Sequence, residues 1–260
     1  MLKKLLAVLV VLAVLFSFAG CTDNVKENTD SSSSKDDTPV SKDIDKADIL
    51  GLWEGEGKMS EVMTAMEQSG ETSELGETMS NMIEVLSKVK SDTEFDVLLK
   101  FNEDNTYDVM YETKSYLEAI KEFYKDLFDL LKTDKELFKK FFGFDDAQID
   151  QAIAGYNLTS FEELVDLLEE TTLNANESDF LDSLKSSLTD AVIEGDYIIE
   201  KGYTYKIDGE YLKIQATKDS DETNDMILKN GKLAFTKFTG VAKNPNAAVF
   251  KNGFEKVDND

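Results

Sequence analysis

Histidine and arginine are absent from this chain of 260 residues, and cysteine, tryptophan and proline are rare, with one, one and two copies. Without histidine or a second cysteine, the chain cannot build a Ser-His-Asp triad, a Cys-His nucleophile or a histidine-ligated zinc site. It also has no G-x-x-x-x-G-K-[ST] loop for phosphate. Paired carboxylates remain, but 53 acidic residues guarantee close pairs, so such pairs do not indicate a glycosidase. We therefore expect a protein that is not an enzyme and needs no cofactor.

Two sequence patterns bear on metal binding, and neither is complete. Asp219, Asp221 and Asp225 share one polar loop, but the sixth and twelfth positions of an EF-hand there hold Asn224 and Asn230 instead of glycine and a bidentate acid. Five of the eight methionines lie between residues 59 and 82, and four of these form the M-x-x-M pairs Met63/Met66 and Met79/Met82, whose thioethers suit Cu(I). Because methionine also fills irregular apolar gaps, we interpret these residues as core packing and predict no metal site.

Acidic residues dominate the charge, which is formally −25 at pH 7. This excess argues against nucleic acid and anionic lipid head groups as partners, since both are negatively charged. Cationic ligands are permitted, but a solvated surface that keeps the protein soluble is the simpler explanation. The composition therefore excludes a nucleic-acid partner without implying a cationic ligand.

The first residues have the pattern of a secretory signal. Lys3 and Lys4 precede an apolar run over residues 5–19, shorter than the roughly 20 residues that cross a membrane. Residues 17–21, SFAGC, resemble the lipobox of bacterial lipoproteins. The resemblance implies cleavage before Cys21 and attachment of acyl chains to it, which would anchor the protein on the extracytoplasmic face of the cell membrane. The alternative for Cys21 is an ordinary buried or stray thiol.

Composition divides the chain into three parts. Residues 1–20 are expected to be the signal peptide. Residues 21–46 are mostly Ser, Asp, Lys, Asn and Thr, so they bury too little apolar surface to fold and are expected to form a disordered tether. Residues 47–260 are long enough for one large domain.

Alternating apolar residues predict antiparallel strands in that domain. Residues 95–101 and 107–111 flank a polar turn, and Asp208-Gly209 and Asn230-Gly231 separate further alternating runs. Both dipeptides favour type I′ hairpin turns, in which both central residues have positive φ, and residues 252–253 form a third such Asn-Gly pair. About eight short strands suit an antiparallel barrel or half-open sheet.

Helical periodicity interrupts these strands. An apolar stripe runs from residue 116 to 131 and continues to 142, and three short helices are expected over 146–154, 161–169 and 179–188. Thr133 with Glu136, and Ser160 with Glu163, predict capping boxes at two helix starts. Residues 113–190 are therefore expected to form a helical insertion, and a smaller helical pattern covers residues 59–90.

Several short motifs resemble lipocalins and lipocalin-like bacterial lipoproteins. Gly51-Leu52-Trp53 resembles their opening G-x-W element, FNEDNTY at 101–107 is similar to their F-x-x-D-G-T-Y hairpin, and residues 202–212 are similar to their Y-x-I-x-G-D-x-L hairpin. The resemblance implies a barrel whose open end admits a small apolar ligand, with helices near the mouth. For Trp53, we favour closure of the barrel base over the alternative of contact with a ligand. Because the chain lacks arginine, only a lysine can take the place of the arginine that stacks on this tryptophan.

We therefore predict an α+β fold, an antiparallel lipocalin-like β-barrel or half-barrel carrying a large α-helical insertion. The predicted function is non-catalytic binding of a small apolar ligand by a lipid-anchored lipoprotein on the bacterial cell surface. The candidate ligand-binding residues are Phe95, Tyr107, Tyr203 and Phe235, for which simple core packing is the alternative.

The alternative function is a structural or protein-interaction module of the cell envelope, whose helices present an anionic face to a partner and which has no ligand cavity. The two hypotheses differ in whether the apolar surface of residues 116–142 is covered by the sheet or left accessible.

Overall fold

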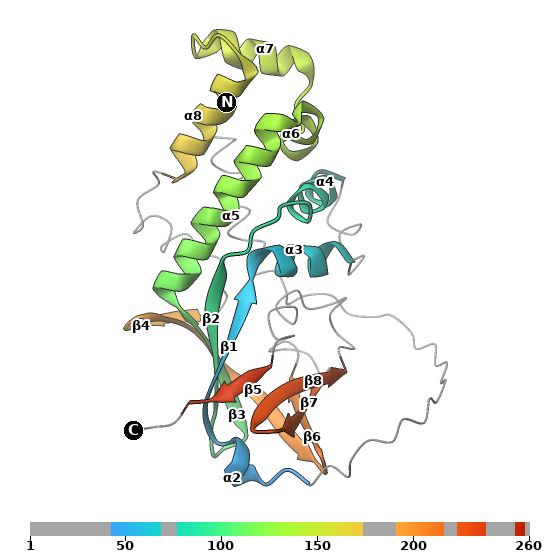
Figure 1. Cartoon of the computed structure of the whole chain (residues 1–260), viewed down its shortest axis with the longest axis vertical. Helices are drawn as coiled ribbons and strands as arrows, with labels where there is room; N and C mark the ends of the chain where they lie inside the picture. The colour runs from blue at the N-terminus through green and yellow to red at the C-terminus, as the bar shows by residue number, and fades with distance from the viewer. Residues whose placement is uncertain (1–42, 69–76, 174–190, 216–222, 238–252, 258–260) are drawn as a thin grey trace, which may run out of the picture.

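The computed structural model describes residues 43–68, 77–173, 191–215, 223–237 and 253–257 (Figure 1). The strands are β1 Gly51–Lys58, β2 Glu94–Phe101, β3 Thr106–Glu112, β4 Ala191–Glu194, β5 Tyr197–Asp208, β6 Tyr211–Gln215, β7 Thr223–Lys229, β8 Lys232–Lys237 and β9 Phe254–Lys256. The helices are α2 Lys46–Ile49, α3 Met59–Gln68, α4 Glu77–Leu86, α5 Thr113–Thr133, α6 Lys135–Phe142, α7 Asp146–Gly155 and α8 Phe161–Leu173. Cys21, the proposed signal peptide and residues 21–42 of the predicted tether lie outside the described residues. The tether prediction was wrong for residues 43–46, because Ile44 is buried in the core, Asp45 caps α2 and Lys46 begins that helix.

The strands form a closed antiparallel barrel. Their hydrogen-bonded order is β3-β2-β1-β9-β8-β7-β6-β5, and β5 pairs back to β3 to complete the ring of eight strands. Strand β4 pairs with β5 beside that ring. The α+β class and the antiparallel barrel are confirmed, and of the two predicted forms it is the closed one.

Two predicted hairpin turns have different geometries. Asn230 and Gly231 have φ of 53° and 80°, as a type I′ turn requires, and they join β7 to β8. The turn between β5 and β6 pairs Asp208 with Tyr211, so Gly209 is its first central residue and alone has positive φ, at 63°. A glycine at that first position is the requirement of type II′, so the type I′ prediction for Asp208-Gly209 was wrong.

The base of the barrel is closed by α2 and Trp53. Trp53 is 1 % exposed, and its indole Nε1 donates a hydrogen bond to the carbonyl oxygen of Ile49, 2.7 Å away. The ammonium of Lys256 lies 5.6 Å from the centre of the Trp53 ring and donates to the Asp48 carbonyl oxygen at 2.8 Å. A lysine therefore covers this tryptophan, and the tryptophan packs in the core at the base.

Helices α5 to α8 follow β3 in the chain and extend away from the barrel on the side opposite α2 (Figure 1). The predicted helices at 116–131, 146–154 and 161–169 are confirmed as α5, α7 and α8, whereas residues 179–188 lie outside the described part. The cap of α6 differs from the prediction, since the carboxylate of Asp134, and not Thr133, accepts the first free amides. Ser160 Oγ accepts from the Glu163 amide as predicted, but the Glu163 carboxylate binds back to Thr159. None of the helices described is both long and apolar enough to cross a membrane.

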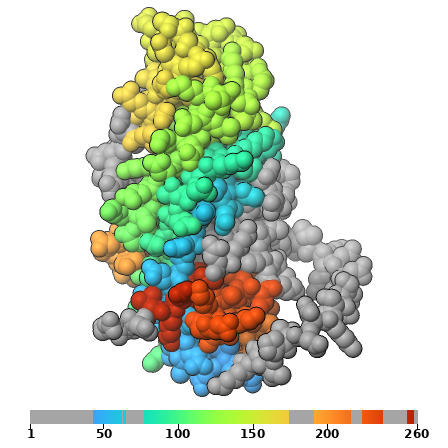
Figure 2. All heavy atoms as spheres, viewed as in Figure 1, coloured from blue at the N-terminus to red at the C-terminus, as the bar shows by residue number. Residues whose placement is uncertain are grey.

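The apolar surface of residues 116–142 is covered. Helix α5 packs on β2 and β3 near its start and on α6 and α8 further along, and its inward residues are buried. Figure 2 shows the side chains of α5 (green) and α8 (yellow) in contact where these helices extend from the barrel. Other helices, more than the sheet, supply the cover, so this surface is not an accessible apolar patch.

Methionines fill the space between the barrel and the helices. Met59, Met63 and Met82 are all buried and belong to the main hydrophobic core. This confirms the packing interpretation for these three residues.

Candidate functional site

The inner wall of the barrel carries a carboxylate at the seam between β3 and β5. Strand β5 pairs Tyr203 with Tyr107 and Glu200 with Val109. Between these two pairs the chain moves by two residues along β3 and by three along β5, and the extra residue on β5 makes a β-bulge. Side chains of paired residues point to the same face of a sheet. Tyr107 and Val109 belong to the core inside the barrel, and Glu200 therefore points inward beside them.

Tyrosine side chains surround Glu200. The Tyr203 hydroxyl donates to Glu200 Oε2 at 2.5 Å, and the Tyr111 hydroxyl lies near enough to the same carboxylate for the negative charge to raise the pKa of Tyr111. The Tyr107 ring lies 5.2 Å from the Tyr203 ring, and the Tyr116 ring lies 5.2 Å from the Tyr111 ring. Glu200 thus sits within a wall of four tyrosines, which we call the tyrosine wall: Tyr107, Tyr111, Tyr116 and Tyr203.

The tyrosine hydroxyls remain protonated at neutral pH. Burial raises the pKa of all four above the ordinary value of 10, and the nearby Glu200 charge raises each further. The wall therefore presents neutral donors and aromatic faces around one acidic side chain.

Two of these side chains are only partly buried. Tyr107, Tyr111 and Tyr116 are buried, whereas Tyr203 and Glu200 are half-buried. Since a half-buried side chain is in contact with solvent, water reaches the inner wall at Glu200 and Tyr203.

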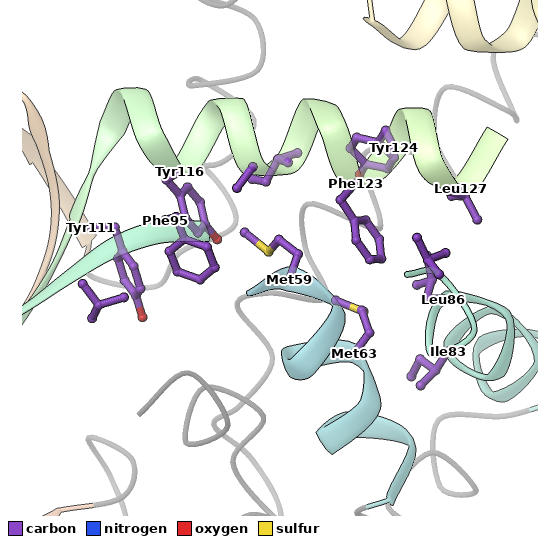
Figure 3. Packing of buried hydrophobic residues seen from close by; sticks show 14 of the residues in the cluster. Met59, Met63, Ile83, Leu86, Phe95, Tyr111, Tyr116, Phe123, Tyr124 and Leu127 are labelled. Carbon is purple, nitrogen blue, oxygen red and sulfur yellow. The ribbon is translucent and has the colours of Figure 1, made fainter. Parts of the chain in front are cut away.

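Towards the helices, the wall is closed by packing. Tyr116 comes from the first turn of α5, and its ring meets the Phe95 ring edge-on at 5.1 Å. Figure 3 shows Tyr111, Phe95 and Tyr116 grouped together, with Met59 of α3 next to them. The start of α5 thus fixes one border of the site.

A second polar group faces the interior from β7. Asn224 is 2 % exposed and pairs with Ile214 of β6, which in turn pairs with Tyr205, and both of these neighbours lie in the core. Its Oδ1 has no hydrogen-bond partner in the described structure. The Tyr107 hydroxyl donates to the carbonyl oxygen of Gln215 at 2.7 Å, one residue after Ile214. Tyr107 therefore reaches from the Glu200 region to the part of the wall that carries Asn224.

The four residues predicted from the sequence all point into the barrel. Tyr107 and Tyr203 contact each other, and Phe95 packs separately with Tyr111 and Tyr116. Phe235 pairs with the fully buried Met226 on the opposite wall and is half-buried against the core. The structure therefore brings two of the four together.

Sequence reasoning missed Glu200, Tyr111, Tyr116 and Asn224. Tyr111 carried a signal, since it alternates with the inward Tyr107 and Val109 in one strand. Glu200 carried none, because an acid inside a barrel is the reverse of the usual pattern.

The wall carries groups that can bind a ligand. Among the described residues, no three acidic or cysteine side chains come together in a way that would hold a metal ion. The groups present can accept hydrogen bonds, attract a positive charge and stack against a flat or apolar molecule. Comparison of the chain with protein-family models, with curated proteins and with solved structures found no match.

Proposed function

We propose that this chain is a lipid-anchored extracytoplasmic lipoprotein whose lipocalin-like barrel binds a small, largely apolar molecule without catalysis. In this proposal, acyl chains on Cys21 hold the protein at the bacterial cell surface, residues 22–42 form the tether, and helices α5 to α8 are an insertion that borders the binding site. The anchor rests on the lipobox resemblance of residues 17–21.

The observation that carries the binding proposal is the inward, half-buried Glu200 beside Tyr203. Moving a carboxylate out of water is costly, and a barrel that served only as a scaffold would be more stable with an apolar side chain there. Ligand-binding sites combine aromatic and apolar walls with a few polar groups that fix orientation. The tyrosine wall with Glu200 and Asn224 has that composition.

The alternative function, a protein-interaction module of the cell envelope, has less support from the packing of the helices. It allows an accessible apolar surface on residues 116–142, and the packing of α5 against α6 and α8 buries that surface. We therefore place binding inside the barrel as the leading function.

The first experiment is native mass spectrometry of the full chain, purified from its membrane in detergent and compared with the same sample after denaturation. We expect a reproducible small added mass that denaturation releases. Glu200→Leu should reduce the occupancy of that mass, whereas Glu194→Leu, which removes an exposed carboxylate from neighbouring β4, should leave it unchanged. A wild-type protein that carries no added mass, or equal occupancy in both variants, would argue against this site.

The anchor is tested separately by the mass of the mature protein. We expect a chain that begins at Cys21 and carries acyl groups. Cys21→Ala should yield a chain that keeps its first 20 residues and carries no lipid, and an unmodified wild-type cysteine would contradict the proposal.

A further inference from the structure

We infer, given the ligand-binding function proposed above, that the ligand is an apolar molecule with an uncharged hydroxyl or N–H group, which donates a hydrogen bond to Asn224 inside the barrel. The argument uses three features of the inner wall: the unused acceptor of Asn224, the chemistry of its neighbours, and the access of solvent to the barrel interior beside it.

The first feature is the direction and burial of Asn224. It alternates along β7 with Met226, which is 0 % exposed, and it pairs with Ile214 of β6, so the three side chains share the inner face. Asn224 is itself 2 % exposed, and its Oδ1 has no hydrogen-bond partner among the residues that the structure describes. Leaving a buried acceptor without a partner is unfavourable, so a ligand that supplies a donor gains affinity there.

The second feature is the set of groups around Asn224. Two tyrosine hydroxyls lie on the neighbouring strands, and each has a single proton to donate. The Tyr107 hydroxyl donates to the carbonyl oxygen of Gln215 at 2.7 Å, and the Tyr205 hydroxyl donates to the carbonyl oxygen of Asn102 at 2.8 Å. Both protons are therefore directed away from Asn224, and the donor has to come from another molecule.

The same neighbours decide the charge of that donor. The side chains beside Asn224 on the inner face, Ile214 and Met226, are apolar. An ammonium group placed among them would exchange its water for one neutral amide, which is a costly desolvation. A hydroxyl or an uncharged N–H has far less hydration to lose, so this position selects an uncharged donor.

The third feature is access. Phe235 of β8 pairs with Met226, and Tyr203 of β5 pairs with Tyr107, so both rings point inward, yet both are half-buried and reach solvent. The strand order β8-β7-β6-β5 places Asn224 on the wall between them. A molecule held between the two rings has aromatic faces for its apolar part and the Asn224 amide for its donor.

The test uses two probes that differ in one proton: 2-phenylethanol, and its methyl ether, which keeps the oxygen but cannot donate. Their affinities for the purified full chain, freed of bound material, are measured by isothermal titration calorimetry. The quantity compared is the ratio of the alcohol affinity to the ether affinity. The contribution of the extra methyl group of the ether cancels when this ratio is compared between wild type and variant.

The decisive variant is Asn224→Val, which removes the amide, is no longer than asparagine and suits a strand. It should lower the alcohol-to-ether ratio at least about 5-fold, and Asn224→Ala, which adds no branch, should do the same. Gln151→Leu removes an exposed amide from α7 and should leave the ratio unchanged. A third probe, 2-phenylethylamine, is cationic at pH 7 and should bind equally to wild type and to Asn224→Val.

Thermal unfolding without ligand separates ligand binding from a structural role for Asn224. Replacing an unsatisfied amide by an apolar side chain should leave Asn224→Val melting at or above the wild type, whereas losing a structural hydrogen bond would lower the melting temperature. The material that denaturation releases from the native protein gives a readout without probes. Its mass should rise in D₂O by at least one exchangeable hydrogen, and Asn224→Val should lower its occupancy.

Two kinds of result would overturn the inference, and they differ in what they leave standing. The barrel would bind apolar molecules without using Asn224 if both variants keep the wild-type ratio, if the amine loses more affinity than the alcohol in Asn224→Val, or if the released molecule takes up no deuterium. If neither probe binds and the native protein carries no added mass, the ligand-binding function fails together with the inference. If neither probe binds but the mass is present, unchanged occupancy in Asn224→Val overturns the inference alone.

Discussion

A glycine-to-alanine substitution at Gly55 should weaken the closure of the barrel. A Cβ atom built on Gly55 lies 2.8 and 2.9 Å from two ring carbons of Phe254 and 3.0 Å from the carbonyl oxygen of Gly253. Phe254 is 1 % exposed, so its ring has little room to move. Strand β9, which holds Phe254, is only three residues long and joins β1 to β8. Overpacking of this kind typically costs about 1–3 kcal/mol.

The assay is thermal unfolding of the purified full chain, followed by far-ultraviolet circular dichroism. For a chain of this size, each 1 kcal/mol should lower the melting temperature by about 2–4 °C. Gly155→Ala is the matched control, because Gly155 ends α7 and a Cβ there meets no atom within 4 Å. It should leave stability unchanged or raise it by up to about 1 kcal/mol.

A second variant tests whether the Phe254 ring causes the loss of stability in Gly55→Ala. Phe254→Leu in the Gly55→Ala background should recover part of the loss, which would appear as a coupling of about 0.5 kcal/mol or more between the two positions. If Gly55→Ala melts with the wild type, the close approach of β1 and β9 at this point is not present in solution, and the reasoning is refuted.

Three further predictions concern the helices. Asp134→Ala should cost about 1 kcal/mol in urea unfolding, because its carboxylate caps two amides of α6, whereas Asp134→Asn should lose less. Leu127→Ala should cost about 2–5 kcal/mol by the same assay, because Leu127 is 0 % exposed in α5, and a smaller loss would mean that the site collapses around the gap. Hydrogen bonds from Lys140 and then Lys88 lower the pKa of Glu84, so the stability that Glu84 contributes is present above its unfolded pKa and is lost as pH falls through its folded pKa. In an NMR titration, Lys140→Met should raise the pKa of Glu84, and an unchanged value would show that this link between α4 and α6 does not form.

The elements that the sequence predicted are those whose evidence is local. Helix α5 has a long apolar stripe at helical spacing, and β2 and β3 alternate on either side of a polar turn. Closure of the barrel depends on β3 pairing with β5, and on β9 pairing with β1, across long stretches of chain. No short pattern encodes such pairings, so the sequence alone left the choice between a barrel and a half-open sheet undecided.

The sequence also could not identify the lysine that stacks on Trp53. The absence of arginine left a lysine as the only cation available, but the chain contains many lysines and their spacing does not single one out. Lys256 takes this position because the pairing of β9 with β1 places it directly opposite Trp53. Its ammonium then reaches both the indole ring and the Asp48 carbonyl oxygen.

The position of Glu200 follows from the bulge in β5. Tyr203, Tyr205 and Ile207 alternate as predicted and face inward, and strict continuation of that period would turn residue 201 inward and residue 200 outward. The extra residue on β5 reverses the phase, so Ile198 enters the core and Glu200 faces the interior. Gly202 permits this, since its φ is 85° and its amide donates to the Asp108 carboxylate at 3.1 Å. Without the bulge, an acid at residue 200 would be an ordinary exposed side chain; with it, the same acid lies among four tyrosines, which is why the binding proposal depends on the structure of β5.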